Sequence, residues 1–347
     1  MKKARILVVS AVASVALAGC GVEREELRIY TWSDYIAPEV VKKFESDNNC
    51  RVVIDTFDSN EAMYAKLKSG SVKYDIIMPS SYQIPVMERE GMIKALDHTK
   101  LKNVKRNFDR RFAMSVLDPS FACSAPYAVT YTGFAYRKDK VGTAPITSWK
   151  VFGTAALRGR MSLLNDMRET IGAGLMSLGF SINSASPEQI AKAVDVVVGW
   201  KKNVATFDNE QYKTAVASGD FFVGHGYSSD VTQTMLQNEN VGFSLPSEGF
   251  AIAFDEMVIA ADSTKVDLAY KFIDFCYDPD VAAANMRVIC APMPVAAAFE
   301  KLDSKHLKLL LLDGDTLKNG EVIRDFSDRP NVQKLYTDAW DRIKAAK

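Results

Sequence analysis

The sequence predicts an α/β protein of two domains built around a parallel sheet. Strand-like and helix-like patterns alternate between residues 27 and 90, as expected for parallel strands joined by right-handed helical crossovers. Removal of a 19-residue leader leaves 328 of the 347 residues, and at about 150 residues per domain this length favours two domains. The apolar stretch FAIAFDEMVIA at residues 250–260 predicts a late, buried strand. If that strand returns to the first domain, the chain crosses between the domains more than once.

The first twenty residues have the parts of a bacterial export signal. Basic residues at positions 2, 3 and 5 precede an apolar run from Ile6 to Ala18, which is too short for a membrane span of about 20 residues. The run ends in LAGC, which resembles the lipobox where cleavage leaves an acylated cysteine. We therefore expect residues 1–19 to be a lipoprotein signal peptide, Cys20 to carry the lipid, and residues 20–26 to form a tether.

Net charge and cysteine spacing limit the possible partners and cross-links. The chain has 43 basic and 43 acidic residues, and three of the basic ones lie in the leader, so the rest carries a net charge of −3. This balance gives no support to a nucleic-acid partner. Cysteines 50, 123, 276 and 290 are widely and irregularly spaced, which leaves three disulfide pairings open; we favour buried thiols.

The first block of the chain predicts three strands with helices after them. The strands are expected at Leu27–Trp32, Arg51–Phe57 and Tyr74–Met78. The helices are expected at Pro38–Asp47, after Asp58, and at Pro85–Glu90. Asp58 and Glu61 have the spacing of a capping box, with Asp58 as the cap.

The loops after the first and third strands should lie at one edge of the sheet. In parallel sheets, ligands bind beyond the carboxyl ends of the strands. The stretches TWSDY and PSSYQ both occupy such positions. This edge therefore collects Trp32, Asp34, Tyr35, Ser80, Ser81 and Tyr82.

A second block begins near Trp149 and places two acids on one helical turn. A strand at Arg160–Leu164 is followed by Asn165 and Asp166, where a helix is expected to begin. Asp166 and Glu169 are three residues apart, so both carboxylates face the same way at the end where the helix dipole favours negative charge. Further helices are expected at Pro187–Trp200 and Val266–Cys276, with GHGYSSD at residues 224–230 as a glycine-rich loop.

Aromatic rings and acids together suit a flexible ligand with separated positive charges. Cations are attracted to aromatic faces, and each buried ammonium needs its own carboxylate or oxygen acceptors. Taken one at a time, the acids allow other interpretations. Asp34 and Asp166 would serve equally as helix caps or loop acids, and Glu169 would serve as a partner of a solvated base. Asp255 lies inside an apolar strand, so it needs a partner, either a ligand or a structural ion pair.

Enzyme motifs are mostly lacking in the sequence. Its three histidines, at positions 98, 225 and 306, form no HExxH pattern, and no paired-cysteine spacing indicates zinc. The stretch GAGLMS only partly matches a dinucleotide-binding turn, and there is no Walker sequence or GxSxG elbow. A glycosidase is the remaining enzyme alternative, and it requires two facing acids about 5 to 9.5 Å apart. We expect no enzyme activity, no metal and no cofactor.

Four segments carry a family resemblance. LRIYTWSDYIAPEVVKKFE, DSNEAMYAKLKSG, YDIIMPSSYQIPVMEREGMIKALD and NDMRE resemble the spermidine/putrescine-binding proteins of bacterial polyamine ABC transporters. The resemblance implies a periplasmic binding protein fold of type II, with a ligand cleft between two domains joined by crossing hinge segments. Domain I would comprise residues 27–133 and 255–300, and domain II residues 134–254 and 301–347. It also implies a monomer in the periplasm, held to the membrane by its lipid, that delivers a polyamine to permease subunits.

The resemblance also assigns roles to single residues. Trp32 and Tyr35 would line the methylene chain of the ligand, with Ser33 in the same motif, and Asp34 would meet an amine. Asp255 would grip an amine. The remaining expected ligand-binding residues are Ser80, Tyr82, Asp166, Glu169 and His225.

Three positions depart from the family pattern. His225, Ala253 and Ala291 stand where the family commonly has aromatic residues, and Tyr227 and Phe254 are the nearby rings that would restore the wall. The choice between putrescine and spermidine therefore stays open. The alternatives are a binding protein of this fold for another cationic small molecule, such as thiamine or an amino acid, and a secreted glycosidase.

Overall fold

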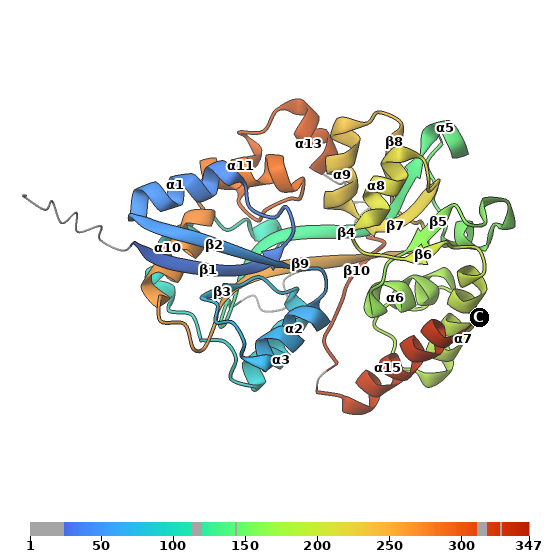
Figure 1. The fold of residues 1–347 in the computed structure, drawn as a ribbon, viewed down its shortest axis with the longest axis horizontal. Coiled ribbons are helices and arrows are strands. Elements are labelled where there is room, and N and C mark those ends of the chain that lie inside the picture. Colours follow the sequence, from blue (N-terminus) through green and yellow to red (C-terminus); the bar gives the residue numbers. More distant parts are fainter. Residues whose placement is uncertain (1–23, 113–119, 143, 311–317, 327, 347) are drawn as a thin grey trace, which may run out of the picture.

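One large mixed sheet runs through the molecule and is shared by two regions (Figure 1). The computed structural model describes residues 24–346 except 113–119, 143, 311–317 and 327. Within these residues the sheet has ten strands in the order β2-β1-β3-β9-β4-β7-β5-β6, with β10 beside β9 and β8 beside β4. The expected signal peptide and the lipid-bearing Cys20 lie outside the described residues. No described helix has the length and apolarity needed to cross a membrane.

The first region confirms the predicted alternation of parallel strands and helices. Strand β1 (Glu25–Trp32) pairs in parallel with β2 (Cys50–Phe57) and with the short β3 (Ile76–Ile77). The intervening helices are α1 (Pro38–Asn48), α2 (Asn60–Ser69) and α3 (Ile84–Arg89). Strand β3 is shorter than expected, although the N–H groups of Asp75 and Met78 donate to Arg28 and Tyr30 of β1 at 2.8 and 2.9 Å on either side of it.

The cap of α2 differs from the prediction. Ser59, rather than Asp58, has the extended backbone of an N-cap, and its Oγ accepts a hydrogen bond from the N–H of Ala62 at 3.2 Å. Asp58 lies one residue earlier and faces the cavity described below. A serine next to an aspartate offers two equally good caps, and the sequence alone does not choose between them.

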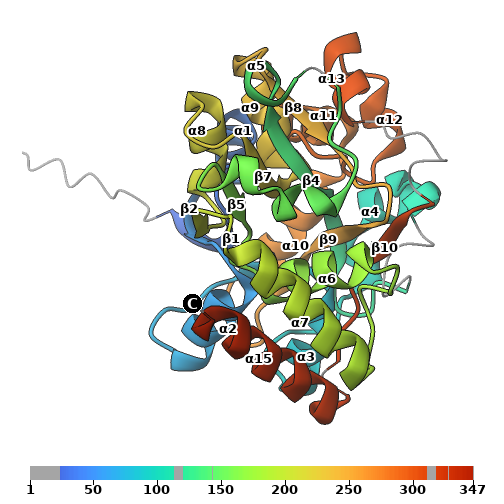
Figure 2. The same ribbon diagram turned by 90° about the vertical axis from the view of Figure 1, so that its right-hand side faces the viewer.

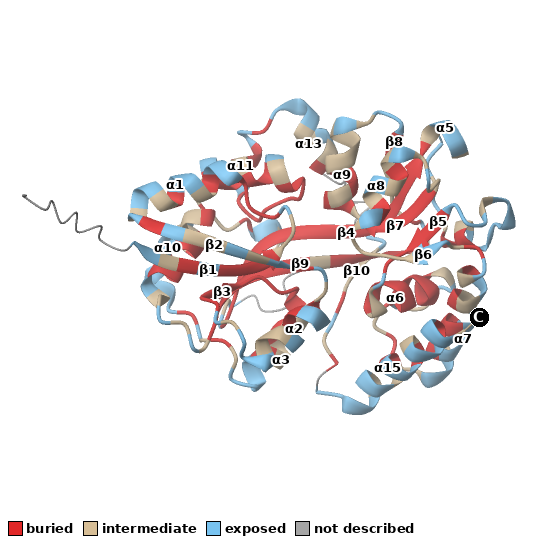
Figure 3. Cartoon of the chain, viewed as in Figure 1, coloured by how far each residue is buried: buried red, intermediate tan, exposed pale blue. Residues whose placement is uncertain are grey.

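Two long antiparallel strands connect the two regions. Strand β9 (Phe250–Ile259) pairs with β3 of the first region and with β4 (Ala125–Arg137), and β10 (Gly320–Val322) pairs with β9. The late apolar strand therefore returns to the first region, as the sequence predicts. Strand β4, which we did not predict, is buried along its whole length, and both strands form the centre of the buried layer in Figure 3.

The second region contains the other strands and most of the later helices. Its strands are β5 (Met161–Leu163), β6 (Thr206–Phe207), β7 (Val223–Tyr227) and β8 (Val241–Ser244). Its helices are α5 (Lys138–Val141), α6 (Met167–Ser177), α7 (Pro187–Lys201), α8 (Gln211–Ser218), α9 (Ser228–Gln237) and α15 (Pro330–Ala345). Helix α15 lies alongside α7, as Figure 2 shows from the end of the molecule.

The segment GHGYSSD is not a loop, which corrects the sequence prediction. Its first half forms β7, and its second half begins α9. The glycines serve close packing rather than a turn, because a Cβ built on Gly226 would lie 2.2 Å from the Tyr212 ring. Glycine in a strand can mark such a close approach, but its abundance here suggested a turn.

Two hydrophobic clusters form the separate cores of the two regions. The first packs β1 against α1, α10 (Val266–Cys276) and α11 (Pro279–Ile289), and the second packs β5 against α6, α7 and α15. Leu302 and Leu310 also belong to the first cluster, so the end of α13 (Ser304–Leu310) packs with the first region. The remaining helices are α4 (Lys102–Asn107) and α12 (Ala296–Phe299).

The four cysteines within the described residues are all buried. Cys50, Cys276 and Cys290 are buried thiols, and burial raises the pKa of Cys290 to about 11. These thiols are therefore uncharged packing groups near neutral pH.

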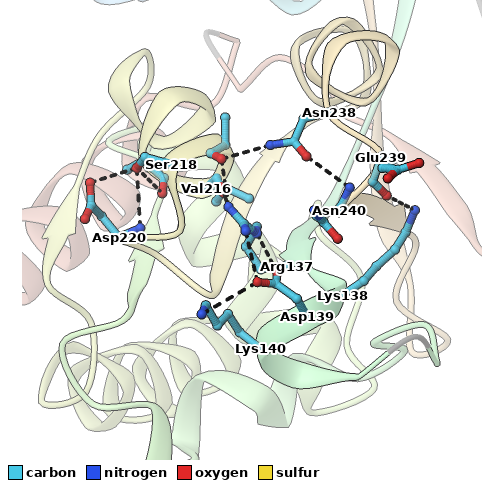
Figure 4. A network of polar contacts seen from close by, with 12 residues as sticks. Arg137, Lys138, Asp139, Lys140, Val216, Ser218, Asp220, Asn238, Glu239 and Asn240 are labelled. Carbon is cyan, nitrogen blue, oxygen red and sulfur yellow. Dashed lines mark hydrogen bonds and ion pairs between the residues drawn. The ribbon is translucent and has the colours of Figure 1, made fainter.

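A polar network fixes α8 and α9 at their ends remote from the cavity (Figure 4). The Nη1 of Arg137, at the end of β4, donates to the carbonyl of Ala217 at 2.7 Å, and its Nε donates to Asp139 at 2.7 Å. Asn238, after α9, donates from Nδ2 to the same carbonyl at 2.9 Å. Bonds to the carbonyl groups at a helix end satisfy acceptors that the helix leaves open.

Candidate functional site

A cavity of about 70 Å³ lies where the first region faces the second. It has room for several water molecules. Eight of the ten predicted ligand-binding residues line it, namely Trp32, Ser33, Tyr35, Ser80, Tyr82, Asp166, Glu169 and Asp255. They come from the loops after β1 and β3, from the start of α6 and from β9, so the cavity lies at the edge of the sheet that the sequence predicts.

Asp255 is a buried carboxylate held by two hydroxyl groups. Tyr35 donates to its Oδ2 at 2.5 Å, and Ser80 donates to its Oδ1 at 2.7 Å. Burial raises the pKa of Asp255 to about 6, while the donors Tyr35, Ser80 and the nearby Trp32 oppose that rise. The Trp32 Nε1–H itself is buried and lacks a well-aligned acceptor. The carboxylate is therefore desolvated, and two hydrogen bonds fix its orientation in the cavity lining.

Asn60, at the start of α2, positions the polar groups of the PSSYQ loop. Its Nδ2 donates to Ser80 Oγ at 3.1 Å and to the Tyr82 hydroxyl at 2.8 Å. Its Oδ1 accepts from the Ser80 N–H at 3.1 Å. Asn60 thus fixes Ser80, which in turn orients Asp255, although the sequence analysis did not single it out.

Asp166 and Glu169 occupy the N-terminal turn of α6, as predicted. Asp166 is the N-cap, and its Oδ1 accepts the Glu169 N–H at 3.0 Å. Burial, and then the charge of Asp166, raise the pKa of Glu169 to about 8, against a hydrogen bond from Thr132 Oγ1 at 3.0 Å. Burial also raises the pKa of Asp166. Two desolvated acids this close share protons as a pair.

Two nearby charged residues, Arg168 and Glu61, interact electrostatically with this pair of acids. Arg168 lies between them in sequence and forms no ion pair with either, although its charge lowers the pKa of both against the larger effect of burial. Its Nη1 donates to the carbonyl of Arg324 at 2.8 Å, and its guanidinium lies over the Phe326 ring. Glu61 of α2 lies outside the lining of this cavity, in a neighbouring hollow that it shares with Arg168; the surrounding protein and then the charge of Asp166 raise its pKa. The exposure of Glu61 to solvent weakens both effects.

A third group of charges surrounds Lys213 on α8. Its Nζ lies 3.4 Å from Glu210 Oε2 and 3.7 Å from Asp230 Oδ1. The Tyr212 hydroxyl donates to the other oxygen of Asp230 at 3.0 Å. Burial lowers the pKa of Lys213, but Asp230 and Glu210 more than offset this, so its pKa is raised and the amine stays charged.

Asp34 and His225 do not line the cavity, contrary to the prediction. Asp34 has a left-handed backbone, with φ of 53°, and its side chain is exposed. His225 is fully buried, with its ring centroid 4.9 Å from that of Trp149, and neither ring nitrogen has a hydrogen-bond partner. Burial lowers the pKa of His225 to about 3, so it is a neutral core residue.

The structure also locates Ala253 and Ala291, which depart from the family pattern, and the nearby rings of Tyr227 and Phe254. Tyr227 lines the cavity, as proposed, whereas Phe254 is buried in a cluster outside it. Ala253 lines the cavity without a ring, and Ala291 is fully buried in the first core. Other lining residues that the sequence analysis missed are Asp58, Asn60, Thr130, Asn209, Glu210, Lys213, Ser229, Asp230 and Ile323.

The lining of the cavity is suited to binding cations. The described chain holds no group of three or more His, Cys, Asp or Glu residues arranged for a metal ion. In the described chain, no Lys or Arg lies within ion-pair distance of Asp255, Asp166 or Glu169. Buried carboxylates that form no ion pair within the described chain, next to aromatic rings, are arranged to receive ammonium groups from a ligand.

Comparisons with known proteins agree with this chemistry. A family model described as bacterial extracellular solute-binding protein matches residues 39–304. A putrescine/cadaverine-binding protein of Pseudomonas aeruginosa is 34% identical over 358 aligned residues, which cover 97% of this chain and 99% of that protein.

Two solved structures are also similar over most of the chain. The spermidine/putrescine ABC transporter substrate-binding protein of Streptococcus pneumoniae is 32% identical with a TM-score of 0.79, over 92% of this chain and 98% of its own. The PotD lipoprotein of Treponema pallidum is 30% identical with a TM-score of 0.82, over 92% and 99%.

Proposed function

Because the chain belongs to the bacterial extracellular solute-binding proteins, we propose that it binds a polyamine and delivers it to the permease of an ABC transporter. The relatives named for putrescine, cadaverine and spermidine support this ligand class, as does the acidic and aromatic cavity. No chemical step on the ligand is part of the proposal.

Asp255 is the observation that carries the proposal. It is 5% exposed, accepts two hydroxyl hydrogen bonds, and has no cationic side chain within ion-pair distance in the described chain. A buried charge without a counter-ion is unfavourable, and an ammonium group of a ligand would supply one. Asp166 and Glu169 would receive the second ammonium, while Trp32, Tyr35, Tyr82 and Tyr227 would line the methylene chain.

The proposed mechanism is closure of the two regions around the ligand. Asp255, Tyr35 and Ser80 belong to the part we assign to domain I, and Asp166 and Glu169 to domain II. A contact already joins the two sides, since Asn209 Nδ2 donates to the carbonyl of Asp58 at 3.3 Å. A ligand that touches both sides only when they are together shifts the population toward closure. The permease would recognise that closed form.

We further propose a periplasmic, monomeric protein held to the membrane by lipid on Cys20. The basic, apolar and LAGC segments of the first twenty residues support this, and one similar structure is described as a lipoprotein. Metabolic labelling with a fatty acid would give a labelled wild type and an unlabelled Cys20→Ser variant if the proposal is right.

Calorimetric titration of ligand-free protein tests the polyamine proposal. We expect saturable binding of putrescine, cadaverine or spermidine, and none of an amino acid. The double variant Asp166→Asn/Asp255→Asn should lose binding by more than about 100-fold while keeping its cooperative thermal unfolding. Binding of thiamine or an amino acid in place of any polyamine would overturn the proposal in favour of another cationic ligand, and turnover of a chromogenic glycoside would favour an enzyme.

A further inference from the structure

Lys213 is a cation built into a cavity that is otherwise acidic. Among the described lining residues it is the only basic one, beside six acids: Asp58, Asp166, Glu169, Glu210, Asp230 and Asp255. Its side chain is 21% exposed, and that of its partner Asp230 is 19% exposed. Both charges are therefore largely withdrawn from water and depend on each other.

The cavity thus has three groups of carboxylates, and only one of them is already neutralised. Asp255 and the Asp166–Glu169 pair have no ion-pair partner in the described chain, whereas Asp230 and Glu210 share Lys213. We propose that Lys213 takes the place of one ligand ammonium at the Asp230–Glu210 end and thereby makes the site selective for diamines over triamines. This inference rests on the proposed function.

Electrostatics and geometry both support this role. A third ammonium that approached Asp230 would meet the like charge of Lys213 at short range in a poorly hydrated site, where repulsion is strong. It would also leave one desolvated cation without a carboxylate of its own. Asp34 and Asp58, from the loops after β1 and β2, are the acids facing this end from the first region, and the Asp34 charge also favours the charged form of Lys213.

Lys213 is not free to leave this position easily. The Tyr212 hydroxyl holds Asp230, and the Tyr227 N–H donates to that same hydroxyl at 3.0 Å, which links α8, α9 and β7. The Arg137 network fastens the far end of α8 (Figure 4). The ammonium is therefore positioned by its helix as well as by its ion pairs.

The test compares putrescine and spermidine by calorimetry on the full chain. We expect the wild type to bind putrescine at least about tenfold more tightly than spermidine. Lys213→Met keeps the aliphatic stem and should shift this ratio about tenfold toward spermidine, because Asp230 is then available to a third ammonium. Lys213→Arg should keep the wild-type ratio. Lys192→Met, which removes an exposed ion pair with Glu188 on α7, is the matched control and should also keep it.

Three results would overturn the inference. These are a wild type that prefers spermidine, a Lys213→Met variant that folds and keeps the wild-type ratio, and a Lys213→Arg variant that behaves like Lys213→Met. The wild-type ratio decides even if Lys213→Met does not fold. A wild type that binds no polyamine would overturn the proposed function as well, whereas putrescine binding with an unchanged ratio would overturn only the role of Lys213.

Discussion

Asp255 and Glu169 are both buried carboxylates that line one cavity, but their neighbours affect their pKa values differently. Asp255 receives two hydroxyl hydrogen bonds, at 2.5 and 2.7 Å, and its pKa is raised only to about 6. Glu169 receives one side-chain hydrogen bond, at 3.0 Å, has the like charge of Asp166 nearby, and its pKa is raised to about 8. Burial raises both values, and the neighbours decide how far.

The difference implies that the two carboxylate sites contribute differently to cation binding. Near neutral pH, Asp255 is mostly ionised before any ligand arrives, whereas the Asp166–Glu169 pair retains a proton. One ammonium of a diamine can therefore bind the ionised Asp255 directly, whereas the other must displace a proton from the Asp166–Glu169 pair. Asp255 should account for more of the affinity, and Glu169 for more of its pH dependence.

Replacement of Asp255 should have the largest effect. Asp255→Asn keeps the shape but removes the charge, and it should weaken putrescine binding about 100-fold at pH 7.5, because a desolvated ammonium loses its counter-ion. Calorimetric titration measures the loss, and thermal unfolding checks the fold. A folded variant within threefold of the wild-type affinity would contradict the role of Asp255.

Replacement of Glu169 should have a smaller effect that depends on pH. Glu169→Gln should weaken putrescine binding about tenfold at pH 8.5, where the wild-type carboxyl is ionised. At pH 6 the wild-type group is already protonated, so the two proteins should bind within about threefold of each other. An equal loss at both pH values would show that Glu169 does not hold the titrating proton.

The raised pKa of Glu169 also predicts that the stability of the ligand-free protein depends on pH. A carboxyl whose pKa is raised on folding binds more protons in the folded than in the unfolded state, so stability falls as pH rises between the unfolded value and the folded one. For Glu169 this window runs from about 4.5 to about 8. Relative to Glu169→Gln, the wild-type melting temperature should fall by about 4 °C between pH 5 and pH 8. A parallel course of the two curves would contradict the raised pKa.

His225 should matter least for binding. His225→Phe should change putrescine affinity less than about twofold, because the ring lies in the core beside Trp149 and not in the cavity. Its lowered pKa gives the opposite sign of pH dependence: the stability it contributes is present above about 6.5 and is lost as pH falls toward 3. The variant should therefore unfold less readily than the wild type in acid. A tenfold loss of affinity would instead return His225 to the binding site.

The sequence predicts the first region better than the second, and the reason is the range of the contacts. Residues 27–90 form successive parallel strands with local helices, so periodicity alone locates Trp32, Tyr35, Ser80 and Tyr82 at one edge. Strand β4 has mixed polarity and partners far away in sequence, namely β7, β8 and β9. Its run of Val, Thr, Tyr and Phe residues is a strand signal that we did not use, but no local pattern identifies these distant partners.

The two misplaced site residues illustrate the same limit. His225 lies two residues before Tyr227, the last residue of β7, and is therefore about 7 Å from the Tyr227 position at the cavity. The flanking glycines suggested a loop, so the sequence analysis did not place His225 within a strand. Asp34 has a left-handed backbone and an exposed side chain, and it is not one of the residues that line the cavity. Lys213 and Asp230 give no signal in the sequence, since each is an ordinary charged residue of a helix until folding brings the two together.

A comparison of two ligands on two proteins tests the central claim most directly. If Asp255 holds one ammonium and the Asp166–Glu169 pair holds the other, putrescine should bind wild type about 100-fold more tightly than butylamine, which has a single ammonium. In Asp255→Asn that advantage should collapse to within about threefold, because the second ammonium no longer has a carboxylate. An advantage that survives undiminished in Asp255→Asn would show that the second ammonium binds elsewhere, and would contradict the account.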